Sequence, residues 1–365
     1  MAVLRLVASG DLADFVKETY FTRYLRGIAV DPKIAERYTN DILQEAMQRY
    51  GIKHNEIELL DGFESFMYEF YRPQDGEFIL RIGHSGRRTP EMIAGEVDWI
   101  NYLARGGANV SRAILSKNGK LVEAIADGHG EQFLATAFLK APGVPPWEAT
   151  LSSDFLEHYG RVIGRIHALT KDYVPPYPTW KRPEWDSPGN LEIADWLPAS
   201  ESAVLQKFQE LLPYFETLPK DRESYGLIHQ DAHGGNFFVH EGKITLFDFD
   251  DCVYGWFIYD IAMVFFYGLM GYEHDPIHVE EYASAFFKGY SQENTLDPKW
   301  LDTLPYFLKL REIDLYALIH RSFDVENLED AWCRRYMEGR KEKIENEVPY
   351  IDFDWSALIQ YLQFR

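Results

Sequence analysis

The chain has 365 residues, of which 46% are hydrophobic and 26% charged, and its formal net charge is −21. This composition is typical of a packed globular protein and excludes a disordered, collagenous or coiled-coil chain, while the length predicts two domains. A protein this acidic repels phosphate backbones and anionic lipid, so we expect neither nucleic acid nor a membrane as its partner.

The cysteines and the apolar segments indicate where in the cell the protein is expected to be. Two cysteines, Cys252 and Cys333, cannot make a disulfide framework, which indicates a reducing, cytoplasmic location. The N-terminal apolar run is interrupted by Arg5 and is too short for a signal peptide. The longest weakly charged stretch, 252–272, contains Asp260, a carboxylate that would cost about 2.5–3.5 kcal/mol in lipid. We therefore predict a buried helix that gives Asp260 hydrogen-bond partners, and no membrane span.

Residues 11–50 carry apolar side chains at three- and four-residue spacing, which predicts helices. The pair Asp31-Pro32 is expected to break this region into two helices, and Gly51 is expected to end the second. We assign residues 1–36 to an N-terminal helical extension.

Residues 52–138 predict a small antiparallel β lobe with one helix laid on it, in the order β-β-β-α-β-β-β. A hairpin turn at 73–76 separates the second and third strand-like runs. Thr89 followed by proline is an N-cap signal for the helix, which is expected to stop at Gly106-Gly107. The later strand-like runs are 113–115, which is expected to pair with 121–123, and then 132–138.

A proline- and glycine-rich stretch at 141–146 is the predicted linker, and the chain beyond it is mostly helical. A long loop at 172–190 contains five prolines. Its Trp180, Arg182 and Trp185 could form a lip of a binding site or anchor the loop, and the sequence favours neither. The predicted helices are 153–170, 199–217, 256–272, 278–290, 298–319 and 325–345.

The residue types of phosphoryl transfer gather around one predicted hairpin, 237–249. Asn236 and Asp248 lie at equal distances from Gly242, so a simple register with a three-residue turn places them opposite each other, and a bulge at that turn could shift the register by one residue. An amide oxygen and a carboxylate there make a hard oxygen site suited to Mg²⁺. Asp231, across a glycine-rich turn from Asn236, can project into the same space and orient or deprotonate a hydroxyl.

This region resembles a known family. His229-x-Asp231-x-x-x-x-Asn236, followed twelve residues later by Asp248, resembles the catalytic loop and metal-binding aspartate of the aminoglycoside phosphotransferase/choline-kinase-like family. The stress-response-kinase and homoserine-kinase type relatives are the nearest. The resemblance covers roughly 37–340 and implies an α+β, bilobal protein-kinase-like fold. Its lobes would be a nucleotide-binding lobe at 37–139 and a catalytic and acceptor-binding lobe at 140–365.

The resemblance also implies roles for individual residues. Asp231 would be the catalytic base, and Asn236 and Asp248 would hold Mg²⁺. Asp260 would bond the backbone of the catalytic loop. The residues implied to contact or orient ATP are Arg81 on the third strand, Glu96 paired with it, Phe138 and Leu139 at the hinge, and Gly62 and Ser65 in the phosphate-covering turn.

The chain departs from the family pattern in two places. The phosphate-covering turn has a single glycine, Gly62, and Arg81 replaces the usual lysine, presenting a planar fork instead of a point charge. The choice of ATP over GTP is therefore less certain than the phosphotransfer itself. Asp250 and Asp251 follow the metal aspartate and could support the metal ligands or be simple turn acids, and we favour turn acids.

The favoured function is an ATP- and Mg²⁺-dependent kinase that phosphorylates a hydroxyl of an aminoglycoside-, choline- or homoserine-like small molecule. A protein Ser/Thr kinase of the stress-response type is the alternative on the same fold. A metal-dependent hydrolase is a second class, because a transition metal could be bound by His229, Asp231, His233, Asp248 and Asp250. It leaves Arg81, Glu96 and the small β lobe without a role. A non-catalytic pseudokinase is suggested by the single glycine of the turn.

The acceptor is the least determined part of this interpretation. The acidity of the chain is compatible with a cationic acceptor, and equally with a solvated acidic surface. A monomer and a homodimer are both compatible with the sequence.

Overall fold

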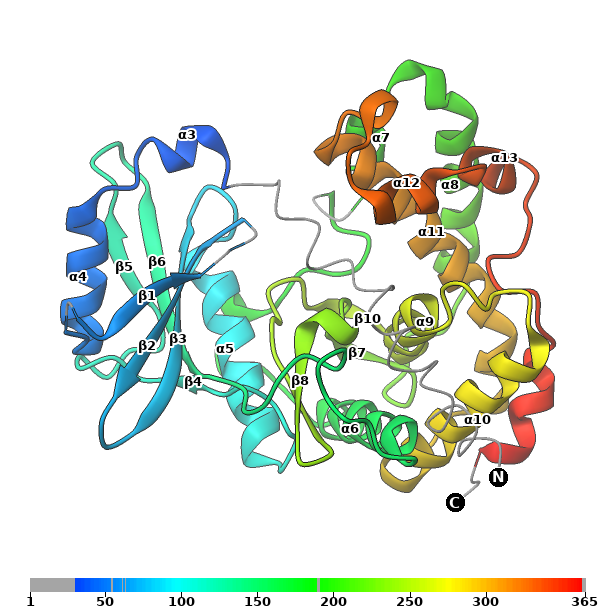
Figure 1. Ribbon diagram of the computed structural model, residues 1–365, viewed down its shortest axis with the longest axis horizontal. Helices are drawn as coiled ribbons and strands as arrows, with labels where there is room; N and C mark the ends of the chain where they lie inside the picture. The colour runs from blue at the N-terminus through cyan, green and yellow to red at the C-terminus, as the bar shows by residue number, and fades with distance from the viewer. Residues whose placement is uncertain (1–29, 54, 61, 63, 189–190, 363–365) are drawn as a thin grey trace.

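The computed structural model of the protein describes residues 30–362 apart from 54, 61, 63, 189 and 190. It has two lobes, one built on a β-sheet and the other mainly of helices (Figure 1). The predicted α+β kinase-like fold, with a small antiparallel lobe and a larger helical one, is confirmed. The part of the predicted N-terminal helices at 11–29 lies outside the described residues.

The smaller lobe is built on one antiparallel sheet in the order β1-β2-β3-β6-β4, with β5 also paired to β6. The predicted hairpin joins β2 to β3 and closes at Gly76, whose φ of 103° suits glycine. The predicted pairing of 113–115 with 121–123 is wrong, because β4 and β5 pair with successive parts of the long β6. The strands are β1 (Ile57–Leu60), β2 (Phe66–Arg72), β3 (Gly76–His84), β4 (Ala113–Ile114), β5 (Glu123–Ala126) and β6 (Gln132–Leu139).

Two helices cover this sheet, one on each face. Helix α5 (Pro90–Arg105) begins as predicted at Thr89, whose hydroxyl accepts a hydrogen bond from the N–H of Met92 at 3.3 Å. Helix α4 (Asn40–Tyr50) packs on the opposite face and ends, as predicted, at Gly51. The prediction of a single helix on this lobe is therefore incomplete, since the apolar stripe of α4 covers the face that α5 leaves open. Alternate residues of β6 pack on the two helices, Phe133, Ala135 and Ala137 on α4 and Leu134 on α5.

The pair Asp31-Pro32, predicted to separate two N-terminal helices, starts a short helix, α3 (Pro32–Ala35), and the segment before it lies outside the described residues. The Asp31 carboxylate accepts a hydrogen bond from the N–H of Lys33 at 2.8 Å, and proline occupies the first helical position. Proline is tolerated there because that position has no intrahelical N–H bond to lose.

The larger lobe is mostly helical. The predicted helix at 325–345 is wrong as a single element, because Asp330 caps a new helix and Gly339, with φ of 63°, begins another. The α-helices are α6 (Phe155–Thr170), α7 (Ile193–Trp196), α8 (Ser202–Glu216), α9 (Phe257–Gly268), α10 (Pro276–Glu293), α11 (Leu304–Ser322), α12 (Ala331–Met337) and α13 (Arg340–Glu345). The 3₁₀ turns include η2 (Pro178–Trp180), η5 (Gly234–Asn236), η6 (Pro298–Thr303) and η8 (Trp355–Tyr361). Two strand pairs, β7 (Tyr225–Ile228) with β10 (Val253–Trp256) and β8 (Phe237–His240) with β9 (Lys243–Leu246), complete the lobe.

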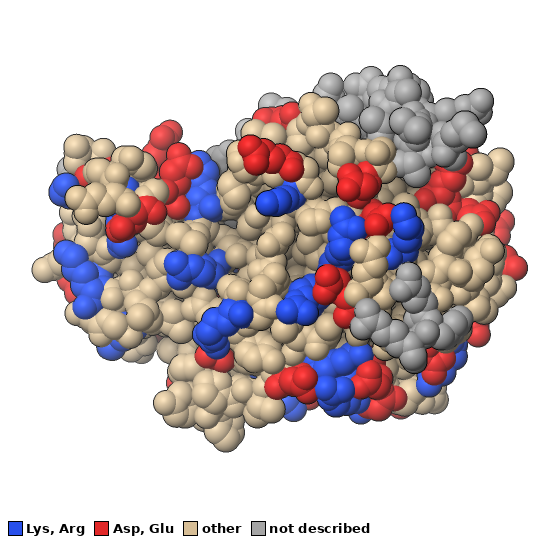
Figure 2. Space-filling model, turned by 90° about the horizontal axis from the view of Figure 1, so that it is seen from below, with Lys and Arg blue, Asp and Glu red and all other residues tan. Residues whose placement is uncertain are grey.

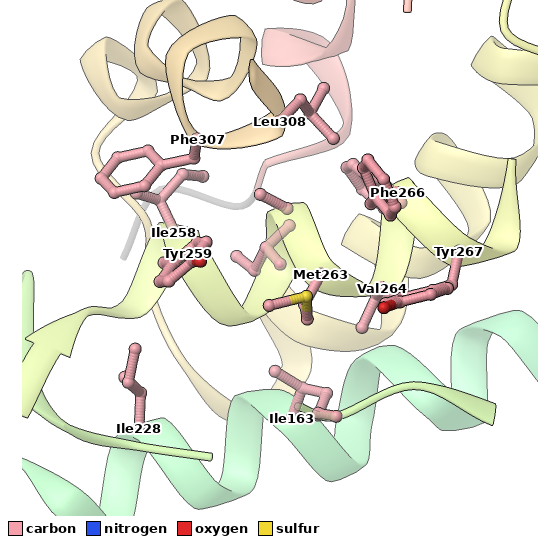
Figure 3. Packing of buried hydrophobic residues seen from close by; sticks show 14 of the residues in the cluster. Ile163, Ile228, Ile258, Tyr259, Met263, Val264, Phe266, Tyr267, Phe307 and Leu308 are labelled. Carbon is pink, nitrogen blue, oxygen red and sulfur yellow. The ribbon is translucent and has the colours of Figure 1, made fainter. Parts of the chain in front are cut away.

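Helix α9 is the centre of the larger lobe, and nearly all of its residues are buried. In Figure 3, Ile163 of α6 and Ile228 of β7 lie on one side of α9, and Phe307 and Leu308 of α11 lie on the other. A helix that is apolar all round belongs inside a lobe, as the sequence predicts for this segment. No described helix is long and apolar enough to cross a membrane.

Charges of both signs alternate over the face shown in Figure 2, where Lys and Arg side chains lie among Asp and Glu. The excess of acid therefore does not form one uniform field over this face.

Candidate active site

The loop that carries the predicted base is held by one buried carboxylate. Asp260 of α9 is fully buried and accepts hydrogen bonds from the N–H groups of His229 at 2.9 Å and Gln230 at 2.7 Å. Its Oδ2 also lies 3.2 Å from Nε2 of His167. Gln230 has a φ of 68°, a left-handed conformation that this pair of bonds stabilises. The predicted bonding of Asp260 to the catalytic loop is confirmed.

Asp231 follows directly and presents two different oxygens. Its Oδ2 accepts a hydrogen bond from Nδ2 of Asn236 at 2.8 Å and lies 3.3 Å from Nε2 of His233. Its Oδ1 is 3.8 Å from Nη2 of Arg311 on α11. Burial raises the pKa of Asp231, but His233, Arg311 and His229 together outweigh burial and hold the pKa below its usual value. The carboxylate is therefore held in the ionised form, and its Oδ1 accepts no hydrogen bond from the part of the chain that the structure describes, as a base requires.

Asn236 is buried and oriented by the same contacts. Its Nδ2 donates to both the backbone oxygen and the carboxylate of Asp231, each at 2.8 Å. Because the nitrogen is committed in this way, the amide oxygen is the atom that Asn236 can offer to a cation.

The hairpin register differs from the prediction by one residue. Phe237 pairs with Leu246, and the backbone N–H of Phe247 donates to the backbone oxygen of Asn236 at 2.8 Å. Asn236 therefore lies opposite Phe247 and not opposite Asp248. The turn has two residues, Glu241 and Gly242, with φ of 49° and 75°. A two-residue turn with positive φ matches the twist of the strands better than the three-residue turn that we expected.

Asp248, like Gln230, has a left-handed backbone conformation, with a φ of 60°. Burial of the carboxylate by the surrounding protein and repulsion from Asp250 exceed the attraction of Arg81, and they raise the pKa of Asp248 to about 7. Asp251 and Asp231 add to the repulsion. Acids held together without enough positive charge are what a divalent cation would stabilise in the ionised form.

Arg81 and Glu96 form a buried two-pronged ion pair between β3 and α5. Nη1 of Arg81 donates to Oε1 of Glu96 at 2.9 Å and Nη2 donates to Oε2 at 2.7 Å, and Glu96 is fully buried. The ring of Phe138 lies 5.1 Å from the guanidinium carbon, and Asp250 Oδ1 lies 3.6 Å from Nη1. Both terminal nitrogens of the Arg81 guanidinium thus bond Glu96, a paired geometry that the single ammonium group of lysine could not reproduce.

Two further predicted nucleotide residues, Ser65 and Gly62, belong to the predicted phosphate-covering turn. Ser65 lines one small pocket together with Arg81, Arg87 and Asp250. Gly62 lies in a tight turn, where an added Cβ would meet the oxygen of Ser65 at 2.2 Å.

The backbone N–H and oxygen of the predicted hinge residue Leu139 both make hydrogen bonds within the protein. Its N–H donates to the oxygen of Arg112 at 3.0 Å and its own oxygen accepts from the hydroxyl of Ser111. Only the Leu139 side chain is therefore free to contact an adenine.

Sequence reasoning missed a set of ion pairs between the lobes. We call residues 247–249, which contain the predicted metal ligand Asp248, the metal segment. Arg87, between β3 and α5, bonds Asp250 directly after this segment, and Arg88 donates to Asp251 at 2.7 Å. The interpretation of Asp250 and Asp251 as simple turn acids is therefore wrong. Burial opposes ionisation of Asp250, but Arg87, Arg81 and Arg88 outweigh it and lower its pKa.

Glu64 of the phosphate-covering turn joins these ion pairs. It accepts from Nε of Arg87 at 2.5 Å and from Nη2 of Arg321, at the end of α11, at 2.9 Å. For the ion pairs to Asp250 and Asp251, the one signal in the sequence was the adjacent pair of arginines before Thr89, and these acids lie 163 residues farther along the chain.

The histidines proposed for a hydrolase are engaged in the loop itself. Nδ1 of His229 accepts from the N–H of Asp231 at 3.2 Å, and its Nε2 lies 3.0 Å from the oxygen of Phe247. Nδ1 of His233 accepts from the N–H of Gly235 at 2.9 Å. Among the described residues, the one group of three or more His, Cys, Asp and Glu side chains close enough for a metal is His84, Asp127 and Glu131, away from this loop. The transition-metal arrangement that a hydrolase needs is therefore not formed here.

Comparison with known proteins gives one consistent answer. Residues 56–302 match the phosphotransferase enzyme family. Amicoumacin kinase of Bacillus subtilis (strain 168) is 37% identical over 326 residues, which cover 88% of this chain and 96% of that protein. A solved amicoumacin kinase, in complex with AMP-PNP, Ca²⁺ and Ami, aligns with a TM-score of 0.84 and 36% identity over 89% of this chain and 99% of its own. A spectinomycin phosphotransferase in complex with ADP and spectinomycin shares the fold, with a TM-score of 0.54 at 17% identity over 88% of this chain and 97% of its own.

Proposed function

This chain belongs to the phosphotransferase enzyme family and is a small-molecule kinase, and we propose that it transfers the γ-phosphate of ATP, with Mg²⁺, to a hydroxyl of an amine-bearing, amicoumacin-like acceptor. The proposal depends above all on one observation, the orientation of the Asp231 carboxylate: Asn236 donates to its Oδ2, whereas its Oδ1 lies 3.8 Å from Nη2 of Arg311 and accepts no hydrogen bond from the described residues. An oxygen placed in this way can accept the hydroxyl proton of an acceptor as the new bond to phosphorus forms.

The nucleotide and metal would be held by groups from both lobes. Arg81, kept in place by Glu96, would contact the phosphates, and Ser65 beside it would bond them from the turn above. Phe138 and Leu139 would pack against the adenine, and Gly62 would let the turn approach the phosphates. The hard oxygen donors of Asn236 and Asp248 fit a divalent cation, which would neutralise the charge that develops on the transferred phosphoryl group.

An amine-bearing acceptor is supported by charge as well as by similarity. Asp314 of α11 lies near enough to Asp231 and Asp251 for both to raise its pKa, although burial is the largest cause. Arg311 is the cation that these acids share on this side, bonding Asp314 and lying 3.8 Å from Asp231. An ammonium group on the acceptor would supply the positive charge that the acids lack. The relative with 37% identity is named for amicoumacin, which agrees with this class.

The proposal includes the division of labour along the chain. Residues 37–139 would bind the nucleotide, residues 140–365 would bind the acceptor and carry out the chemistry, and residues 1–36 would be an extension. Cys252 and Cys333 are buried and unpaired, which supports a cytoplasmic enzyme. One active site is complete within one chain, so the proposal needs no second copy, although a homodimer is compatible with it.

A coupled assay for ADP release tests the proposal. The purified chain with Mg²⁺ and ATP is given amicoumacin, a simple amino alcohol, spectinomycin, choline or a generic protein substrate, with Asp231→Asn as the control. We expect the highest kcat/KM for the amine-bearing amicoumacin-type acceptor, and no turnover of it by the control variant. Turnover of the protein substrate alone, or equal turnover with the control, would refute the proposal.

A further inference from the structure

The long proline-rich loop extends from the larger lobe onto helix α5. From the sequence, its Trp180, Arg182 and Trp185 could form a lip of a binding site or anchor the loop. We call its described residues, 172–188, the strap. Its turn η2 packs on α5, and Figure 1 shows the strap in green beside that helix. Gly95 of α5 permits this approach, because a Cβ there would lie 2.0 Å from the backbone oxygen of Trp180. The residue after Gly95 is Glu96, the partner of Arg81.

The strap is also fixed to the strands behind the catalytic loop. The N–H of Trp185 donates to the oxygen of Tyr254 at 2.8 Å, and the N–H of Tyr254 donates to the oxygen of Pro183 at 2.8 Å. Trp185 is buried, with its ring 5.1 Å from that of Trp256. Because Tyr254 belongs to β10, which pairs with β7, the strap extends the strand pair from which the catalytic loop begins.

Arg182 joins three segments from the middle of the strap. Its Nη2 donates to the backbone oxygen of Asp250 at 2.6 Å and its Nε donates to that of Cys252 at 2.8 Å, both just after the metal segment. Its Nη1 donates to the oxygen of Met92, in the first turn of α5, at 3.1 Å. Arg182 is only 3% exposed, so it cannot form the lip of an acceptor site.

From these contacts we infer that Arg182 is a positioning residue for the reaction, which fixes the helix carrying Glu96 to the segment carrying Asp248. The inference rests on the proposed roles of those two acids. In an α-helix the oxygen of Met92 also bonds the N–H of Glu96, so Arg182 acts one turn from that side chain. A guanidinium has five N–H donors in a rigid plane and can serve three carbonyls at once, whereas an ammonium group on a flexible chain cannot hold all three.

The consequence is a fixed distance between the phosphate-contacting pair and the metal ligand. If Arg182 is lost, α5 and the metal segment keep their own hydrogen bonds but lose the group that sets their separation. Displacements of about 1 Å at a reacting centre reduce rates by about a hundredfold. Among the described residues, Arg182 bonds Met92, Asp250 and Cys252 and none of α11, so an acceptor side formed by α11 should be unaffected.

The test compares Arg182→Lys with Arg165→Met. Arg165 is a matched control because it also reaches from the larger lobe to α5, donating from Nη2 to the oxygen of Gly106 at 2.5 Å, but at the far end of that helix. Affinity for AMP-PNP with Mg²⁺ is measured by calorimetry, and kcat and the acceptor KM are measured by ADP release. For Arg182→Lys we expect nucleotide affinity and kcat each to fall by about tenfold or more, with the acceptor KM within about twofold. Arg165→Met should change all three by less than about twofold.

Two further measurements keep the inference open to refutation if a variant folds poorly. Gly95→Ala keeps the Arg182 side chain unchanged but pushes the strap, and Arg182 with it, off α5, so it should give the same loss of nucleotide affinity. In the wild-type chain, AMP-PNP with Mg²⁺ should slow hydrogen exchange at Trp185 and Tyr254 together with the metal segment. Wild-type affinity and kcat in a folded Arg182→Lys, or protection of the metal segment without the strap, would overturn the inference.

The same calorimetry separates this inference from the proposed function. Asp248→Asn should abolish the Mg²⁺-dependent part of nucleotide binding. If it does so while Arg182→Lys binds normally, Arg182 is not a positioning residue but the metal site stands. If Asp248→Asn binds Mg²⁺ and nucleotide like the wild type, the proposed metal site itself is wrong.

Discussion

The catalytic loop and the phosphate-covering turn are held in opposite ways. Around the loop, His229 and Asp260 are fully buried, and the loop is fixed by hydrogen bonds from its backbone to one carboxylate. The turn is held at Glu64 by ion pairs to Arg87 and Arg321, and the side chains of all three are 21–32% exposed. Buried hydrogen bonds to a charge are strong and insensitive to salt, whereas exposed ion pairs are weak and screened.

This difference matches the work that each region would do. A base and metal ligands must stay within a fraction of an ångström of one geometry through every cycle. A turn that covers a nucleotide must let it enter and leave, so weak and reversible contacts suit it. We therefore expect changes at the loop to abolish activity or unfold the protein, and changes at the turn to adjust binding.

Asp231→Asn should have the largest effect of the changes considered. Asparagine keeps the shape and the contact with Asn236 but cannot accept a proton, so kcat should fall by about a thousandfold or more. Binding of AMP-PNP with Mg²⁺, measured by calorimetry, should persist. A variant that keeps more than about a tenth of the wild-type kcat would show that the loop does not supply the base.

Asp260→Asn tests whether one buried carboxylate fixes the loop. Both oxygens accept backbone N–H groups, and an amide would put its NH₂ against one of those donors. We expect a loss of about 3 kcal/mol in the free energy of unfolding by urea, with kcat reduced in the protein that remains folded. Asp352→Asn, at an exposed acid in the same lobe, is the control and should change stability by less than about 0.5 kcal/mol. Equal stability of the two variants would contradict this account of the loop.

Glu96→Gln tests the one part of the nucleotide lobe that is built like the catalytic loop. The pair with Arg81 is buried and doubly bonded, so removing its negative charge leaves a buried guanidinium partly uncompensated. We expect the KM for ATP to rise by about tenfold, with the acceptor KM unchanged. Glu91→Gln, at an exposed acid in the first turn of the same helix, should leave both values unchanged. A rise in the acceptor KM alone would place Glu96 in the wrong site.

The sequence predicted what local spacing determines. Asp231, Asn236 and Asp248 lie on one short segment, and the helix with Asp260 follows it directly, so their order, their residue types and the family resemblance were enough to group them, and their roles stay predictions. The predicted hairpin register was wrong by one residue because the register depends on whether the turn at Gly242 has two or three residues.

What the sequence could not predict are contacts between residues far apart in the chain. Arg182 bonds residues 68 to 90 positions away, and Arg321 meets Glu64 across 257 positions. No periodicity or motif encodes such a distance, because it is set by how the two lobes pack. Single-sequence reasoning therefore gave Asp250 and Asp251 as turn acids, although the fold uses them to join the lobes.

Glu64→Gln should have the smallest effect and is the sharpest test of the weak region. It weakens the ion pairs to Arg87 and Arg321 without changing shape, and partly exposed pairs are worth about 0–1 kcal/mol. We expect the KM for ATP to change by at most about threefold at low salt and the difference to vanish near 0.5 M salt, where screening extends over only a few ångströms. Arg321→Gln removes one of these two ion pairs and should give a change no larger than that of Glu64→Gln. The double variant should match Glu64→Gln, because that variant has already lost the contact with Arg321. The exposed Arg105→Gln is the control. A large, salt-independent loss of kcat in Glu64→Gln would mean that the turn is as rigid as the catalytic loop, and the division between the two regions would not hold.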